Sequence, residues 1–224
     1  MSKNRKQDCW YKSVCNLDCP SVCLRYIEMK FLMESSGIPK SRQLPLDLIS
    51  LNEKDKKAFK QLDEIKNNIK EFVDAGKNLY ICSSSTGTAK TSWAFKLMLK
   101  YFDTIWPGNG MKVRGLFIHV PTFLQQLKDF DSPLPKSYID DIKECDLVIW
   151  DDIAASDLTK YEYNQLLLYI DTRVTNNKSN IYTSNICTKN TLNKTVGARL
   201  ASRIFSLAEV ITFSASDIRE GVKN

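Results

Sequence analysis

Short apolar segments alternate with helix-like segments along most of the chain. From Lys57 an apolar residue recurs at every third or fourth position, which predicts one amphipathic helix that ends before Gly76. Buried strands are predicted at residues 78–82, 115–120, 145–150, 180–183 and 209–213, with further helices from residue 90 and at 121–127, 161–174 and 196–205. Strands separated by helices form a parallel sheet covered on both faces, so we predict an α/β fold. Ligands of such sheets bind at the carboxyl ends of the strands, which directs attention to the loops after Cys82, Trp150 and Thr183.

Length, composition and charge restrict the class of protein further. The chain has 224 residues, of which 43% are hydrophobic and 26% are charged, as is typical of soluble globular proteins. No apolar stretch approaches the roughly 20 residues that cross a bilayer, and the first residues lead into no apolar signal segment. We therefore expect a cytoplasmic protein without a membrane partner. Lys and Arg number 32 against 26 Asp and Glu, and the resulting net charge of +6 permits nucleic-acid binding without requiring it.

Four of the seven cysteines lie close together near the start of the chain. Their gaps are compatible with a tetrahedral zinc site formed by Cys9, Cys15, Cys19 and Cys23. A chain without a secretory signal is expected in a reducing compartment, which favours metal over disulfides; an iron–sulfur cluster and free thiols stay open as alternatives. We expect residues 1–45 to form a small Cys-rich module with a linker, and residues 46–224 to form the main domain. The other three cysteines are expected in the core.

The loop after the first predicted strand has a phosphate-binding pattern. Residues 84–91 match G-x-x-x-x-G-K-[ST], with Ser84 and Ala89 in place of the two framing glycines. In such a loop the backbone N–H groups and a helix N-terminus face the phosphates, while Lys90 reaches the β- and γ-phosphates and Thr91 binds magnesium. The residues expected around the nucleotide are Ser84, Ser85, Thr86, Gly87, Thr88, Ala89, Lys90, Thr91 and Ser92. An ordinary strand-to-helix turn rich in Ser and Thr is the alternative.

Two adjacent acids follow the predicted strand at 145–150. An apolar strand that ends in acids is the Walker B pattern, in which Asp151 would belong to the magnesium shell. Asp152 would orient or deprotonate the attacking water, a position more often held by Glu, so its shorter side chain predicts slow hydrolysis. Either motif alone is also typical of a helix cap, but the two motifs at strand ends and in this order predict an NTPase-type site.

Further segments match one family of ATPases. They are Ser36-Gly37-Ile38-Pro39, residues 90–94, residues 120–124, the strand that ends in Asp151-Asp152, and Tyr182-Thr183-Ser184-Asn185. With these segments the chain resembles AAA+ ATPases of the DnaC/DnaI-type helicase-loader group and their phage-encoded relatives. The resemblance covers nearly the whole chain from Ser36 and implies a P-loop AAA+ core that binds ATP and magnesium.

The resemblance also implies roles for residues outside the two motifs. In the family the Asn of the Thr-Ser-Asn step is sensor 1, so Asn185 would help to position water against the γ-phosphate. Residues 198–205 resemble the segment that supplies an arginine finger to a neighbouring subunit. Arg203 is our choice for it, although Arg199 lies one helical turn away on the same face and the sequence does not separate them. Arg219 resembles the sensor 2 position.

The function implied by the resemblance is helicase loading. Subunits that self-associate through the ATP site would grip a DnaB-type replicative helicase through the Cys-rich module and place it on single-stranded DNA. Loaders of the DnaI type carry a metal-stabilised amino-terminal domain, which favours zinc by analogy. Residues 127–143 could line a DNA path or form only a solvated helix face, and His119 is expected to have no catalytic role. An IstB-type transposition regulator, and a nucleotide-gated helicase adaptor or inhibitor with little hydrolysis, are the alternatives.

Overall fold

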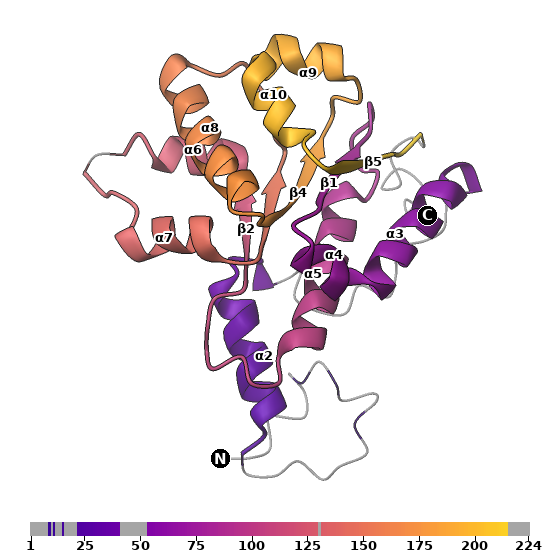
Figure 1. The fold of residues 1–224 in the computed structure, drawn as a ribbon, viewed down its shortest axis with the longest axis vertical. Coiled ribbons are helices and arrows are strands. Elements are labelled where there is room, and N and C mark those ends of the chain that lie inside the picture. Colours follow the sequence, from indigo (N-terminus) through magenta and orange to yellow (C-terminus); the bar gives the residue numbers. More distant parts are fainter. Residues whose placement is uncertain are drawn as a thin grey trace, which may run out of the picture.

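The computed structural model describes residues 9, 11, 15, 22–40, 53–129 and 131–214 (Figure 1). These residues contain a five-stranded sheet with the strand order β2-β3-β4-β1-β5. The strands pair in parallel and are β1 (Asn78–Cys82), β2 (Gly115–His119), β3 (Leu147–Asp151), β4 (Ser179–Ser184) and β5 (Ala208–Thr212). The prediction of an α/β fold with a parallel sheet is confirmed.

Helices cover both faces of this sheet (Figure 1). One face carries α2 (Leu24–Ser35), α3 (Lys56–Asn67), α4 (Ile69–Asp74) and α5 (Lys90–Ile105), and a 3-10 turn, η2 (Glu53–Asp55), leads into α3. The other face carries α6 (Val120–Gln126), α7 (Lys136–Glu144), α8 (Lys160–Thr175), α9 (Lys189–Val196) and α10 (Ala198–Ile204). Within the part of the chain that the structure describes, no helix has the length and apolar character needed to cross a membrane.

Alternation of side chains along the strands produces the two apolar clusters. In β1, Leu79 and Ile81 lie in the cluster with α3 and α5, whereas Tyr80 and Cys82 lie in the cluster with α8 and α10. All five residues of β1 are buried. A strand buried on both faces reads as a continuous apolar run, which is why the sequence pattern identified it.

The helix predicted from Lys57 is two helices in the structure. Asn68 leaves the helical conformation with φ −116° and ψ 28°, and its Nδ2 donates a hydrogen bond to the carbonyl oxygen of Glu64 at 3.0 Å. A side chain that bonds to the nearby backbone competes with the helix, so α3 ends and α4 begins there. The helix predicted at 196–205 corresponds to α10, which begins only at Ala198 because Gly197 has φ +80° and separates it from α9, a helix that was not predicted.

Helix α2 lies between the Cys-rich segment and the main domain. Its inner face joins the cluster of α3 and α5 through Met29, Leu32 and Met33. Tyr11 Oη and Arg25 Nη2 both donate to Asp103 Oδ1 near the end of α5, at 2.7 and 2.8 Å. Tyr11 and the start of α2 are thus attached to the end of α5, and the domain boundary at residue 45 stays a prediction.

Candidate nucleotide-binding site

The candidate site lies at the carboxyl edge of the central three strands. β3, β4 and β1 are neighbours in the sheet, so the loops that follow them leave from the same edge. The loop of residues 83–89 joins β1 to α5, Asp151 is the last residue of β3, and Asn185 follows β4. Residues far apart in sequence are therefore brought together where the alternation of strands and helices placed the expected site.

The loop after β1 turns on two residues with positive φ. Gly87 has φ +68°, and Ala89, which occupies the second framing-glycine position, has φ +66° and ψ 14°. The left-handed region costs an alanine about 1 kcal/mol or more, so Ala89 preserves the backbone course of a glycine at an energetic cost. Ser84 and Thr86 are exposed, Ser85 and Ser92 are half-buried, and Thr88 is buried. Helix α5 begins directly after this turn, so its N-terminal N–H groups lie at the carboxyl edge of the sheet, where they can bind phosphate.

Lys90 is held inside this loop by oxygen acceptors. Its Nζ donates to the carbonyl oxygen of Ser85 at 3.1 Å, to Asn185 Oδ1 at 2.9 Å and to Thr88 Oγ1 at 3.4 Å. The residue is only 7% exposed, and burial lowers the pKa of Lys90 even though Asp152 and Asp151 favour its charged form. The lysine of the first motif and the predicted sensor residue are thus in direct contact.

Asp151 receives two hydroxyl donors. Thr91 Oγ1 and Thr183 Oγ1 each donate to Asp151 Oδ1 at 2.7 Å. The carboxylate is 5% exposed, and burial raises its pKa against the effect of these hydrogen bonds. The hydroxyl of Thr91 and the carboxylate of Asp151 are oxygen ligands of the kind that Mg²⁺ prefers, so the residues present fit a magnesium ion bound with a nucleotide.

Thr183 and His119 are site residues that the sequence analysis did not select. Thr183 also accepts a hydrogen bond from the backbone N of Asp152 at 3.0 Å, and it thereby fixes both acids. His119 ends β2 in register with Asp151, and its Nε2 lies 3.7 Å from Asp152 Oδ2. The signal for Thr183 was its place in the Thr-Ser-Asn step. The signal for His119 was a polar side chain inside the apolar strand predicted at 115–120.

Asp152 follows β3 in an unusual conformation. Its φ is +55°, and its side chain is 40% exposed. A non-glycine residue in the left-handed region is uncommon, and such strain gathers at functional sites. The carboxylate faces solvent and His119, so it can reach a ligand placed over the loop.

The two arginine-finger candidates point to one carboxylate of their own chain. Arg203 Nε lies 2.5 Å from Asp171 Oδ1 on α8, and Arg199 Nη2 lies 4.0 Å from Asp171 Oδ2. The Arg203 side chain is 41% exposed and that of Arg199 is 67% exposed, so both are accessible from outside. The assignment of Arg203 as the finger stays a prediction, and Arg219 lies outside the described residues.

The zinc assignment also stays a prediction. Cys9 and Cys23 are half-buried and Cys15 is exposed, while Cys19 lies outside the described residues. Of the three cysteines expected in the core, Cys82 and Cys145 are buried and Cys187 is only partly buried.

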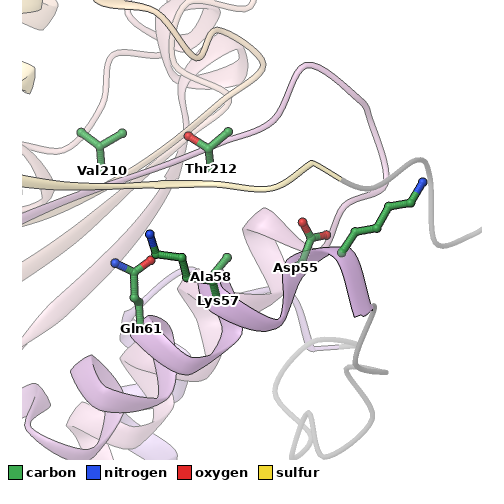
Figure 2. Close-up of a pocket in the computed structure, with 7 residues that line it drawn as sticks. Asp55, Lys57, Ala58, Gln61, Val210 and Thr212 are labelled. Atoms are coloured by element: carbon green, nitrogen blue, oxygen red, sulfur yellow. The ribbon is translucent and has the colours of Figure 1, made fainter.

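A separate cavity of about 340 Å³ lies beside the edge strand β5 (Figure 2). It is bounded by the start of α3 and by Val210 and Thr212 of β5. Asp55 at its margin is 2% exposed and accepts a hydrogen bond from the backbone N of Ser214 at 2.7 Å. This contact joins the start of α3 to the end of β5, and the cavity contains none of the residues of the two motifs.

Comparisons with known proteins agree with this geometry at the level of the fold. No protein-family model matches the chain, and no curated protein gives a significant match. Among solved structures, the crystal structure of the DnaC helicase loader is 20% identical with a TM-score of 0.65, and the match covers 79% of this chain and 100% of that one. The crystal structure of DnaI is 19% identical with a TM-score of 0.63, over 81% of this chain and 94% of that one. The replication initiator DnaA bound to AMPPCP and single-stranded DNA is 19% identical with a TM-score of 0.56, over 77% of this chain and 52% of that one.

The sheet order and these matches define a P-loop α/β fold of the AAA+ class. Within that class the chain has a fold of the DnaC/DnaI type.

Proposed function

We propose that this protein binds ATP with magnesium at the carboxyl edge of its sheet and hydrolyses it slowly. The observation that carries the proposal is the contact of Lys90 with Asn185 beside the contact of Thr91 with Asp151. Lys90 would hold the β- and γ-phosphates, and Thr91 with Asp151 would hold the magnesium. Bound magnesium would neutralise charge that develops on the phosphoryl group.

The remaining groups support a hydrolytic role for the site. Asp152 is partly exposed and adjacent, so it can accept a proton from a water molecule, and Asn185 can orient that water by hydrogen bonding. We propose that Arg203 of a neighbouring copy completes the site, since Arg203 lies on α10, at the surface of its own chain. Self-association through the ATP site follows from this assignment.

Slow turnover is part of the proposal. Asp152 is shorter than the Glu usual at this position, and its backbone is in the left-handed region. Ala89 adds a Cβ where the pattern has glycine, which restricts the loop. These two features also support the alternative of a nucleotide-gated adaptor or helicase inhibitor, in which ATP binding matters and turnover does not.

We further propose that the ATP-bound form loads a DnaB-type replicative hexameric helicase onto single-stranded DNA. The likeness of the fold to the DnaC helicase loader and to DnaI supports this. The Cys-rich segment, with zinc bound to Cys9, Cys15, Cys19 and Cys23, would contact the helicase. Because that segment rests on α5 through Tyr11 and Asp103, it is connected to the helix that starts at Lys90.

The test is light scattering with size-exclusion chromatography of the protein mixed with the replicative helicase of its source organism. We expect a complex of defined stoichiometry with ATP and Mg²⁺, and a weaker one or none with the Lys90→Ala variant. The Lys60→Ala variant, altered at an exposed lysine of α3, is the matched control and should behave as the wild type. A complex that forms equally well without nucleotide and with the Lys90→Ala variant would support a nucleotide-independent adaptor.

Absence of any complex would contradict helicase loading. Binding of duplex DNA in preference to single-stranded DNA, without helicase affinity, would then favour the IstB-type transposition regulator. ATP binding is measured separately by titration, so neither of these outcomes contradicts the proposed nucleotide site.

A further inference from the structure

His119, Asp151 and Asp152 form a side-chain cluster at the carboxyl ends of β2 and β3. One possible ligand atom of each residue lies within 4.8 Å of those of the other two. Strand pairing produces the cluster, because His119 and Asp151 occupy the same register position on adjacent parallel strands. An imidazole with two carboxylates is a donor set typical of divalent transition-metal ions.

The imidazole is oriented as a metal ligand is oriented. His119 Nδ1 lies 2.8 Å from Oγ1 of Thr122, the third residue of α6, and the other ring nitrogen points to Asp152. Metal-binding histidines commonly donate one ring N–H to an oxygen and so fix the tautomer that leaves the second nitrogen free to ligate. With its hydrogen on Nδ1, His119 donates to Thr122 Oγ1 and has Nε2 free to bind an ion.

The distance between His119 and Asp152 fits an ion better than a direct hydrogen bond. His119 Nε2 and Asp152 Oδ2 are 3.7 Å apart, beyond hydrogen-bonding range. Two atoms that each bind one ion at about 2.1 Å lie no more than about 4.2 Å apart. The observed pair is within this limit. The ligand atoms of the cluster lie at most 4.8 Å apart, so a pair at that distance would have to approach by only about 0.6 Å to share one ion.

The local charge also favours a cation. Asp151 and Asp152 supply two negative charges, and Lys90, which faces both, supplies one positive charge. Asp151 is buried, where charges are screened less than at the surface. The hydroxyls of Thr91 and Thr183 already satisfy Asp151 Oδ1, which leaves its second oxygen for an ion.

We propose that His119, Asp151 and Asp152 form a binding site for a first-row divalent transition-metal ion of the Mn²⁺ class, which the chain binds without nucleotide. The imidazole discriminates against Mg²⁺, because nitrogen ligands suit transition metals and Mg²⁺ prefers oxygen. The inference deepens the proposed nucleotide site, at which Asp151 is also assigned to magnesium. Its test, however, needs no ATP.

The probe is Mn²⁺ added to untagged, nucleotide-free protein after treatment with a chelator. We expect one ion per chain, measured as loss of the electron paramagnetic resonance signal of free Mn²⁺, with Mg²⁺ competing only at tenfold or greater excess. Mn²⁺ is preferred to Zn²⁺ or Co²⁺ because thiolates, including those of the Cys-rich segment, are poor ligands for it. The chain contains a single histidine, so a nitrogen-14 coupling to bound Mn²⁺ in pulsed measurements identifies His119.

Variants separate ligation from a structural role. His119→Asn should weaken Mn²⁺ binding by at least about 10-fold, because loss of a ligand costs no less than loss of a residue that orients one. It should change Mg²⁺ binding by less than threefold. Thr122→Val should weaken Mn²⁺ binding about 10-fold, whereas Asp140→Asn on α7 is the surface control and should have no effect. Circular dichroism of each variant checks that it is folded.

Equal losses of Mn²⁺ and Mg²⁺ affinity in His119→Asn would overturn the proposal. It would also be overturned if bound Mn²⁺ shows no nitrogen coupling, or if Mn²⁺ binds only when ATP is present. Binding of ATP with Mg²⁺ by the same samples is followed with a fluorescent ATP analogue. Failure of Mn²⁺ binding with ATP binding intact rejects this inference alone, and the reverse result rejects the nucleotide site alone.

Discussion

The two ends of the central sheet both carry polar clusters, but the clusters are organised differently. At the amino ends of β3 and β4, Arg173 is fully buried, and its guanidinium donates to Asn180 Oδ1 at 2.7 Å and to the carbonyl oxygens of Ile142, Cys145 and Ser179 at 2.8, 2.9 and 2.6 Å. At the carboxyl ends, Lys90 and Asp151 are also buried but lie beside the partly exposed Asp152 and a loop with left-handed residues. The first cluster is closed to ligands and the second is open.

The difference shows how one sheet separates stability from ligand binding. A buried cation is tolerated where its donors meet acceptors with good geometry, as those of Arg173 do. Asp146, next to this cluster, is likewise bonded by Tyr101 and Arg114, and their hydrogen bonds hold its pKa below the usual value. At the other edge, strain at Ala89 and Asp152 remains, as expected where a ligand supplies the missing interactions.

The largest predicted effect is on stability, at the closed end. Arg173→Met should lower the free energy of unfolding by about 4 kcal/mol, because the buried carbonyl oxygens of Ile142, Cys145 and Ser179 lose a charged donor at once. Urea unfolding followed by circular dichroism measures the change. Arg199→Met, at an exposed arginine, is the control and should shift stability by no more than about 0.5 kcal/mol. A loss below 1 kcal/mol for Arg173→Met would remove the contrast between the two ends.

The second effect is on binding, at the open end. Lys90→Ala should weaken ATP binding by about 2 kcal/mol, or about 30-fold, since it removes a charged donor to phosphate. Its stability should change by less than about 1 kcal/mol, because burial already disfavours the charged lysine. Titration with a fluorescent ATP analogue and urea unfolding give the two numbers. A large loss of stability with unchanged ATP affinity would make Lys90 a structural residue like Arg173.

Thr183 connects the two kinds of effect. Thr183→Val keeps the shape but removes the hydroxyl that binds Asp151 and the backbone N of Asp152, so stability should fall by about 1.5 kcal/mol. ATP hydrolysis, measured by phosphate release, should fall as well because both acids lose their positioning contact. Thr183→Ser retains the hydroxyl and should recover most of the activity. Activity of Thr183→Val equal to that of the wild type would contradict the positioning role.

The smallest effect tests the strained loop. Ala89→Gly should stabilise the fold by about 0.5 kcal/mol, because relief of the left-handed strain exceeds the entropy that glycine loses. Ala154→Gly, at φ +65°, is the matched control and should gain a similar amount without a change in ATP affinity. Thermal unfolding and ATP titration of both variants distinguish strain in the loop from strain elsewhere. A destabilised Ala89→Gly would show that the alanine is not strained.

The sheet and the two motifs could be predicted from the sequence because each rests on local patterns. The apolar run of β1 and the small residues after it indicate a strand and a loop without reference to distant residues. The break at Asn68 could not be predicted in this way, because Ile65 and Ile69 on its two sides continue one apolar period and the interruption depends on a side-chain hydrogen bond. Helix α2 was missed because its burial depends on contacts with α5 and β2, far along the chain.

For the candidate site, residue types and spacing predicted Lys90, Thr91 and Asp151, and the structure brings Thr91 of α5 into contact with Asp151 of β3. His119 was assigned no role because its neighbours in sequence are apolar and its place beside Asp152 arises only from the register of β2 with β3. The closed cluster around Arg173 depends on pairing between strands in the same way.

The most direct test of the central claim is isothermal titration of the purified protein with ATP in the presence of Mg²⁺. We expect one saturable site per chain in the wild type, at the carboxyl edge of the sheet, with the affinity reduced about 30-fold in Lys90→Ala. No heat of binding at millimolar ATP, or equal affinity in the two proteins, would contradict a nucleotide site at this edge.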